Sequence, residues 1–146
     1  MTTEDLMYYK TNTNEVSLDP SDWESLRKLG HRMVEDMVSY LQGLRDRPVW
    51  REIPDEVRKE LDRPVPTAPE GAEKAYEDFL NYVQPYPHGN HHPRFWGWVN
   101  GTGMPLAALA EMLAATINSN VAGGEHSAVL VEEQVLKWFK DLLGFA

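Results

Sequence analysis

Between residues 23 and 47 the apolar positions recur at steps of three and four, which is the spacing of one face of an α-helix. We therefore predict a first helix that begins at Trp23 and is stopped by Pro48. The preceding Asp19-Pro20-Ser21-Asp22 is typical of a helix start. One stripe of this helix must bury against another surface, and its members are Leu26, Leu29, Met33, Met37, Tyr40, Leu41 and Leu44.

Prolines dominate the stretch that follows, from residue 48 to residue 71. Each proline ring removes a hydrogen-bond donor and clashes with the preceding turn, so only one short helix, from Asp55 to Asp62, fits there. The apolar period returns between Ala72 and Val83, with charged residues on the opposite face. This pattern predicts a third helix that ends before Pro85.

Two further helices are predicted in the last third of the chain. Residues 104–118 are almost all Ala, Leu and Met, with Pro105 in the first turn, where a missing N–H costs nothing. A helix that is apolar nearly all round is typical of the interior of a larger body. The fifth helix would be capped by Ser127 and end at Gly144-Phe145. No segment has a strand pattern, so we predict a mostly α fold of about five helices joined by Pro-rich and aromatic loops, without a sheet of its own.

The segment between the third and fourth helices combines helix breakers with aromatic residues. Residues 85–103 predict an irregular loop that is too aromatic for an ordinary solvated one. Along an extended backbone, Trp96 and Trp98 would lie on one side, because side chains alternate there. Two indoles on one side could form a stacking platform. Pocket lining and core packing both remain open for these aromatic residues.

Composition then limits the class of protein. The 146 residues are 42% hydrophobic and 25% charged, which is typical of one soluble globular domain. The absence of cysteine excludes disulfides and cysteine chemistry, and the net charge of −9 opposes binding to nucleic acid or anionic lipid. No apolar stretch reaches the roughly 18 residues of a membrane span. Residues 1–19 carry no targeting pattern and are interpreted as a flexible tail, so we expect a cytoplasmic protein.

Two weaker patterns have a structural explanation beside a chemical one. His88, His91 and His92 could bind a metal ion, but they lack the i, i+4 spacing that directs two imidazoles at one ion. Packing or hydrogen bonding within the loop is the favoured interpretation. Asn100-Gly101-Thr102-Gly103 could cradle a phosphate at the start of a helix, but it lacks the lysine of a P-loop. A tight turn is favoured for it.

Several separated motifs follow one another over roughly residues 20–146. They are the first helix with Gly30, Met33 and Val34 through Tyr40 and Leu41, the run His92-Pro93-Arg94-Phe95-Trp96-Gly97-Trp98-Val99, then Pro105 and Leu109-Ala110-Glu111-Met112-Leu113, and finally Ser127 through Trp138 to Leu142-Leu143-Gly144-Phe145. In this order they resemble the N-terminal part of the pyridoxal-phosphate-dependent group II decarboxylases. That family includes the aromatic-L-amino-acid, tyrosine, histidine and glutamate decarboxylases.

The resemblance implies the N-terminal helical segment of a fold-type I pyridoxal-phosphate-dependent enzyme. Residues 20–86 would be a helical dimerisation segment that packs against the other subunit of an obligate, domain-swapped dimer. Residues 87–146 would be the aromatic substrate-side loop with the first helices of a truncated transferase-like domain. The implied substrate-binding residues are Trp98, Val99, Asn100, Gly101 and His91. The segment implied to reach the neighbouring subunit's pocket consists of Asn120, Val121 and Ala122.

The chain also departs from the family pattern. The run from Ser127 to Glu132 lacks the Pro and Thr that many relatives have there, and Trp98 and Gly101 stand where many aromatic-acid members carry Tyr and Thr. The substrate therefore does not follow from the resemblance. The family's Schiff-base lysine follows a histidine, and no lysine in this chain does. We expect no catalytic residue, cofactor ligand or metal ligand here, and no decarboxylation by this chain alone.

The first interpretation is thus the N-terminal portion of a pyridoxal-phosphate-dependent amino-acid carboxy-lyase, as a truncated product, a split-enzyme half or a fragment. In the complete enzyme its partner would be a second copy in a homodimer, or a complementing C-terminal chain. The alternative is a free-standing helical interaction module without catalytic activity. A small metal-binding helical protein, using the three loop histidines, ranks third.

Overall fold

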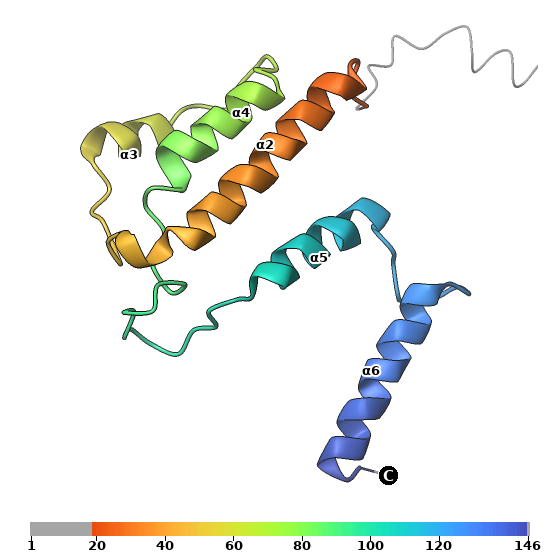
Figure 1. The fold of residues 1–146 in the computed structure, drawn as a ribbon. Helices are drawn as coiled ribbons and strands as arrows, with labels where there is room; N and C mark the ends of the chain where they lie inside the picture. Colours follow the sequence, from red (N-terminus) through yellow and green to blue (C-terminus); the bar gives the residue numbers. More distant parts are fainter. Residues whose placement is uncertain (1–18, 146) are drawn as a thin grey trace, which may run out of the picture. The chain divides into compact units, whose positions relative to one another are not determined.

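The computed structural model describes residues 19–145, which form five α-helices and two short helical turns (Figure 1). No strand occurs in this range, which confirms the mostly α prediction. The chain divides into two compact units that separate between Phe95 and Trp96, and each unit is described by itself. The predicted flexible tail lies almost wholly outside the described residues, and the predicted domain boundary at residue 86 stays a prediction.

The first helix, α2, spans Trp23–Gln42 and begins where the sequence predicts. The side chain of Asp22 caps it, since Oδ1 accepts hydrogen bonds from the backbone N–H of Glu24 at 2.9 Å and of Ser25 at 3.2 Å. The Ser25 hydroxyl also donates to Asp22 Oδ2 at 2.6 Å. The hydrogen bonds from the Ser25 side chain and from these backbone N–H groups lower the pKa of Asp22, because they favour the charged carboxylate.

The end of α2 differs from the prediction. The helix ends at Gln42, before Pro48 can stop it, and a 3₁₀ turn, η1 (Leu44–Asp46), follows. The N–H of Gly43 still bonds the Ser39 carbonyl at 3.0 Å, and the next bonds tighten to the i→i+3 spacing. Glycine is a poor helix former, so the α-helix ends there, about one turn before the proline.

Two short helices complete the first unit. Helix α3 spans Asp55–Leu61 in the Pro-rich stretch, and α4 spans Ala72–Asp78. A π-helical turn, η2 (Phe79–Val83), continues α4, with the N–H of Gln84 donating to the Phe79 carbonyl at 2.9 Å. The predicted extent of 72–83 is confirmed, while the change from α to π geometry has no counterpart in the hydrophobic pattern.

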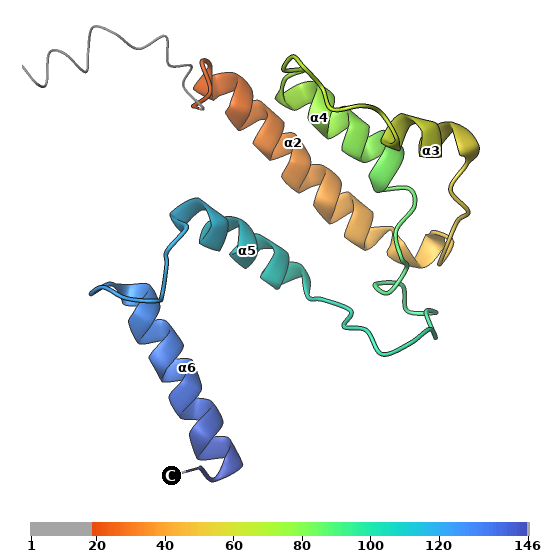
Figure 2. The ribbon, with the colours of Figure 1, turned by 180° about the vertical axis from the view of Figure 1, so that it is seen from behind.

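The core of the first unit is small and centres on Tyr76 of α4, which is only 7% exposed. Its hydroxyl donates to Asp36 Oδ2 of α2 at 2.8 Å, and the Arg32 guanidinium lies 5.3 Å from the ring centroid and pairs with Glu73. Figures 1 and 2 both show α4 beside α2. Burial, followed by the hydrogen bond to Asp36, raises the pKa of Tyr76 to about 12.

The second unit holds two longer helices. Helix α5 spans Pro105–Ile117, begins with the predicted proline and ends at Asn118, which has a left-handed φ of 48°. Helix α6 spans Ser127–Leu143. Its predicted cap is wrong: His126 occupies the N-cap, Ser127 is already helical, and no side chain caps the helix. The predicted end is confirmed, since Gly144 is left-handed with φ 70° and the Phe145 N–H donates to the Lys140 carbonyl at 3.0 Å.

No described residue of α5 or α6 is buried. Large apolar side chains stand exposed along both helices, and they include Leu106, Met112, Leu113, Ile117, Leu130, Val131, Trp138, Phe139, Leu142 and Leu143. An apolar surface of this extent is uncommon on a monomeric protein. None of the described helices is long and apolar enough to cross a membrane.

Candidate functional site

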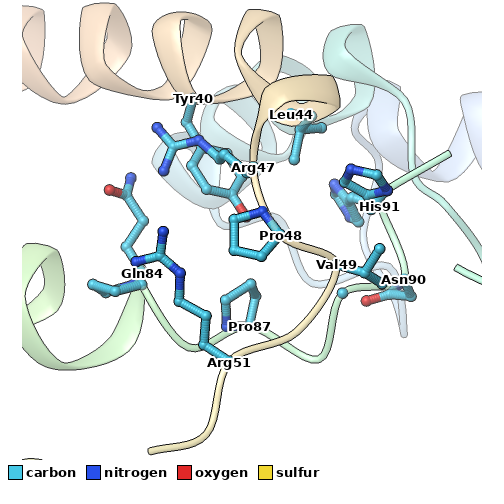
Figure 3. Close-up of a pocket in the computed structure, with 13 residues that line it drawn as sticks. Tyr40, Leu44, Arg47, Pro48, Val49, Arg51, Gln84, Pro87, Asn90 and His91 are labelled. Carbon is cyan, nitrogen blue, oxygen red and sulfur yellow. The ribbon is translucent and has the colours of Figure 1, made fainter. Parts of the chain in front are cut away.

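The loop that follows η2 closes a pocket within the first unit. The pocket has a volume of about 410 Å³, and its walls come from residues 40–51 and 84–92, two segments far apart in the sequence. Figure 3 shows its labelled side chains, with Pro48 and Pro87 between the arginines and His91. The polar lining residues are Tyr40, Arg47, Arg51, Gln84, Asn90, His91 and His92.

A glycine allows the two walls of this pocket to approach. Gly89 is buried and has a φ of 92°, in the left-handed region that favours glycine. A Cβ at this position would overlap the carbonyl oxygen of Val49. The loop therefore packs directly on the backbone of the segment after η1, which holds residues 88–92 in place beside Arg47 and Arg51.

The three loop histidines have different surroundings. His92 is 4% exposed, and its Nδ1 accepts a hydrogen bond from the Arg94 N–H at 3.0 Å, while its Nε2 is buried without a partner. His88 packs edge-on against Phe95 with the ring centroids 5.2 Å apart, and His91 is exposed at the pocket. Within the described part of the chain, no three His, Asp or Glu side chains are grouped as metal ligands would be.

The remaining predicted substrate-side residues lie in the second unit, before α5. Trp98, Val99, Asn100 and Gly101 are all exposed, and Trp98 is 82% exposed. Trp98 has a φ of 44°, which is rare for a bulky residue and costs roughly 1–3 kcal/mol of backbone strain. The predicted side-to-side alternation of Trp96 and Trp98 is therefore wrong, because alternation requires an extended backbone and this one bends.

The predicted neighbouring-subunit segment lies in the same unit, after α5. The Ala122 N–H donates to Asn120 Oδ1 at 2.9 Å, and the His126 ring Nε2 lies 3.0 Å from the Asn120 carbonyl oxygen. These two bonds fold residues 118–126 into a compact turn. The 13 residues of α5, at 1.5 Å each, separate this turn from Trp98–Gly101 by about 20 Å. One copy of the chain thus does not bring the two segments together.

The structure brings together one set of residues that the sequence did not indicate. Arg47 and Arg51 face the same pocket as His91, and the Arg47 guanidinium lies 4.6 Å from the centroid of the Tyr40 ring. No short motif joins these residues, because they come from two distant segments. The only available signal is the density of arginine around Pro48, with Arg45, Arg47 and Arg51 in one exposed stretch.

Comparison with known proteins gives a consistent group of relatives. No family model matches the chain. It is 26% identical over 137 residues to tyrosine decarboxylase 1 of Narcissus pseudonarcissus, covering 92% of the chain and 27% of that protein. It is 27% identical over 131 residues to tryptophan decarboxylase 2 of Oryza sativa subsp. japonica, covering 86% of the chain and 26% of the relative.

A third relative is shorter in alignment but higher in identity. The aromatic-L-amino-acid decarboxylase of Catharanthus roseus is 30% identical over 101 residues, which cover 68% of the chain and 20% of that protein. The chain thus spans about a quarter or less of the length of the curated relatives it matches.

Proposed function

Because the chain is related to the group II pyridoxal-phosphate-dependent amino-acid decarboxylases, we propose that it is the N-terminal portion of such a carboxy-lyase. Its role would be to supply one wall of the substrate pocket and a surface of the dimer. The observation that carries this proposal is the exposed apolar surface of α5 and α6, in a chain aligned over 92% of its length with a relative about three and a half times as long. Helices that pack against the rest of an enzyme expose their apolar faces when that part is absent.

The proposed partner is a second copy within the complete enzyme, or a complementing C-terminal chain. Trp138 and Leu142 of α6 are 57% and 81% exposed, and each side chain that becomes fully buried contributes about 1.5–3 kcal/mol. Covering the exposed apolar side chains of α5 and α6 would favour association, in opposition to the translational and rotational freedom that is lost when two bodies join. The isolated chain lacks this contribution. We also propose that the complete enzyme has the type I fold of pyridoxal-phosphate-dependent enzymes.

We assign the substrate side to His91 and to Trp98, Val99, Asn100 and Gly101. The indole of Trp98 offers a flat apolar surface for a substrate side chain, and its backbone strain is typical of functional sites. Asn120, Val121 and Ala122 would reach the pocket of the neighbouring subunit. Their separation from Trp98–Gly101 by the length of α5 supports this division between two copies.

The described residues do not fit a covalent pyridoxal phosphate site. Such a site needs a lysine for the Schiff base, and no lysine lies in the described loops that carry the proposed substrate residues. Lys74 pairs with Asp78, and Lys137 donates to Asp141 at 2.7 Å, both within helices. The cofactor of the proposed complete enzyme would therefore be held by residues outside this chain, and we assign no chemical step to it here.

The experiment that tests the function combines this chain with the remaining three quarters of a decarboxylase, as the downstream reading frame or a relative's C-terminal part. We expect a pyridoxal phosphate absorbance band and CO₂ release from an amino acid only when both pieces are present. Trp98→Ala should lower CO₂ release in the complex, while Trp96→Ala, two residues away and 93% exposed, serves as the matched control. An absorbance band and turnover from this chain alone would contradict the proposal.

The same exposed helices favour a second candidate, a helical interaction module without catalytic activity. It differs in one measurable respect, because a module would bind its partner without any gain of CO₂ release. A stable complex with the C-terminal piece that stays inactive on a panel of amino acids would favour the module.

A further inference from the structure

The pocket between residues 40–51 and 84–92 is lined by two arginines, Arg47 and Arg51, to which the proposed function assigns no role. We propose that this pocket binds a small anion bearing a carboxylate or phosphate group, held by the guanidinium groups of Arg47 and Arg51. The proposal rests on the first unit alone and does not depend on the decarboxylase relationship.

The charged residues that line the pocket are basic and not acidic. Two arginines and two histidines face the pocket, and no Asp or Glu is among its described lining residues, in a chain whose net charge is −9. Within the part of the chain that the structure describes, neither Arg47 nor Arg51 forms an ion pair. A guanidinium presents its N–H donors as a planar fork that matches carboxylate and phosphate oxygens. Two unpaired forks at one concave site favour an anion.

The two arginines are also placed so that both can reach one ligand. Stacking on the Tyr40 ring orients the Arg47 guanidinium before any ligand arrives, so less side-chain freedom is lost on binding. Figure 3 shows Arg47 and Arg51 both extending toward the side of the pocket where Gln84 lies, with His91 on the other side. A volume of about 410 Å³ is within the range of small-molecule sites.

His92 adds a further donor near the pocket. Because its Nδ1 accepts the Arg94 N–H, the neutral ring carries its proton on Nε2, which is buried without an acceptor. A buried donor without a partner is uncommon and calls for an explanation. The Nε2 atom is buried, and the proposal does not require it to contact the ligand. The proposal therefore rests on the two arginines.

The test uses the full chain labelled with ¹⁵N and follows its backbone amides by NMR. Inorganic phosphate and malonate are titrated separately, with sodium chloride holding the ionic strength constant. We expect saturable shifts that centre on Gly89, Asn90 and His91. Arg51→Gln should weaken binding about tenfold, which corresponds to the loss of one charge-assisted contact. Arg45→Gln removes the same charge from an exposed position outside the pocket and should change the affinity less than about twofold.

The outcomes separate the possible ligands. Saturation by phosphate alone assigns a phosphate-bearing ligand, by malonate alone a carboxylate, and by both a site for either group. Absence of saturable shifts with both anions, or equal weakening by the two variants, would overturn the proposal. If Arg51→Gln loses the spectral dispersion of a folded chain, Arg51→Lys replaces it, since lysine keeps the charge but loses the fork. Weakened binding by Arg51→Lys supports the proposal, and unchanged binding overturns it. None of these results bears on CO₂ release.

Discussion

The two units differ in how much of their apolar surface they cover by themselves. The first unit buries Leu29, Val57 and Tyr76, and it ties α2 to α4 through the Tyr76–Asp36 hydrogen bond. The second unit buries no described residue, although its helices are more apolar than those of the first. The more hydrophobic part of the chain is thus the part without a core of its own.

This difference indicates which contacts stabilise the helices of each unit. Helices are stabilised mainly by packing of an apolar face, and local propensity alone is marginal for a helix of 13 or 17 residues. The first unit supplies some of that packing internally, while α5 and α6 require another surface. Mutations in the first unit should therefore change the free energy of unfolding of the isolated chain. Mutations in the second unit should mainly change its association.

The largest effect is expected at Gly89. Gly89→Ala forces a side chain into the left-handed region and against the Val49 carbonyl, so we expect a loss of about 3 kcal/mol or more in the free energy of unfolding. Gly144→Ala is the matched control in the second unit, because Gly144 is also left-handed but a Cβ there meets nothing within 4 Å. Its expected cost is about 1 kcal/mol. Urea unfolding measures both, and equal losses would contradict the role of Gly89 packing.

A smaller effect is expected at the bond between α2 and α4. Tyr76→Phe removes the hydroxyl that donates to Asp36 and leaves that partly buried carboxylate without its donor. We expect a loss of about 1–2 kcal/mol in the free energy of unfolding at neutral pH. Chemical denaturation measures the loss, and Tyr82→Phe, a half-buried tyrosine of η2, provides the comparison.

The same variant has a signature in alkaline solution. The pKa of Tyr76 is about 12 in the folded chain against an ordinary value of 10.0, so the neutral phenol is favoured by folding. Its contribution is fully present below pH 10 and is lost as the pH rises from 10 to 12, on the order of 2–3 kcal/mol, since one pKa unit corresponds to about 1.4 kcal/mol. Tyr76→Phe should lose less stability over this window than the unchanged chain. An identical loss in both would refute the shift.

The smallest effect on the free chain is expected on α6. Leu142→Gln changes a side chain that is already 81% exposed, so the free energy of unfolding should change by less than about 0.5 kcal/mol. Self-association should nevertheless weaken, because the substitution removes exposed apolar surface that drives association. Light scattering over a concentration series measures this, with Lys140→Gln on the same helix as control. A clean monomer for the unchanged chain at every concentration would refute the prediction of self-association.

Several local features follow from the sequence alone. Asp22 before α2, Pro105 in the first turn of α5 and Gly144 after α6 each act on backbone groups within a few residues, so their effects can be predicted without knowing the fold. The errors lie where two local preferences compete. Gly43 ends α2 before Pro48 does, and His126 rather than Ser127 takes the N-cap of α6.

The candidate site could be predicted only in part. The sequence predicts site roles for Trp98–Gly101 and Asn120–Ala122 through a family resemblance, and the decarboxylase relatives support the resemblance itself. The roles of these residues stay a prediction. The sequence could not indicate the left-handed backbone of Trp98, because a positive φ runs against the preference of a bulky residue. Nor could it indicate the pocket beside His91.

The hydrophobic period, the caps and the prolines were sufficient for the number and approximate bounds of the α-helices, since each depends on neighbours within one or two turns. Tertiary structure alone decided that Tyr76 meets Asp36, that Gly89 rests on Val49, and that Arg47 and Arg51 share a pocket with His91. These pairings join residues about forty positions apart. They depend on which faces pack together, and the hydrophobic pattern along the sequence does not specify which distant segments pack against each other.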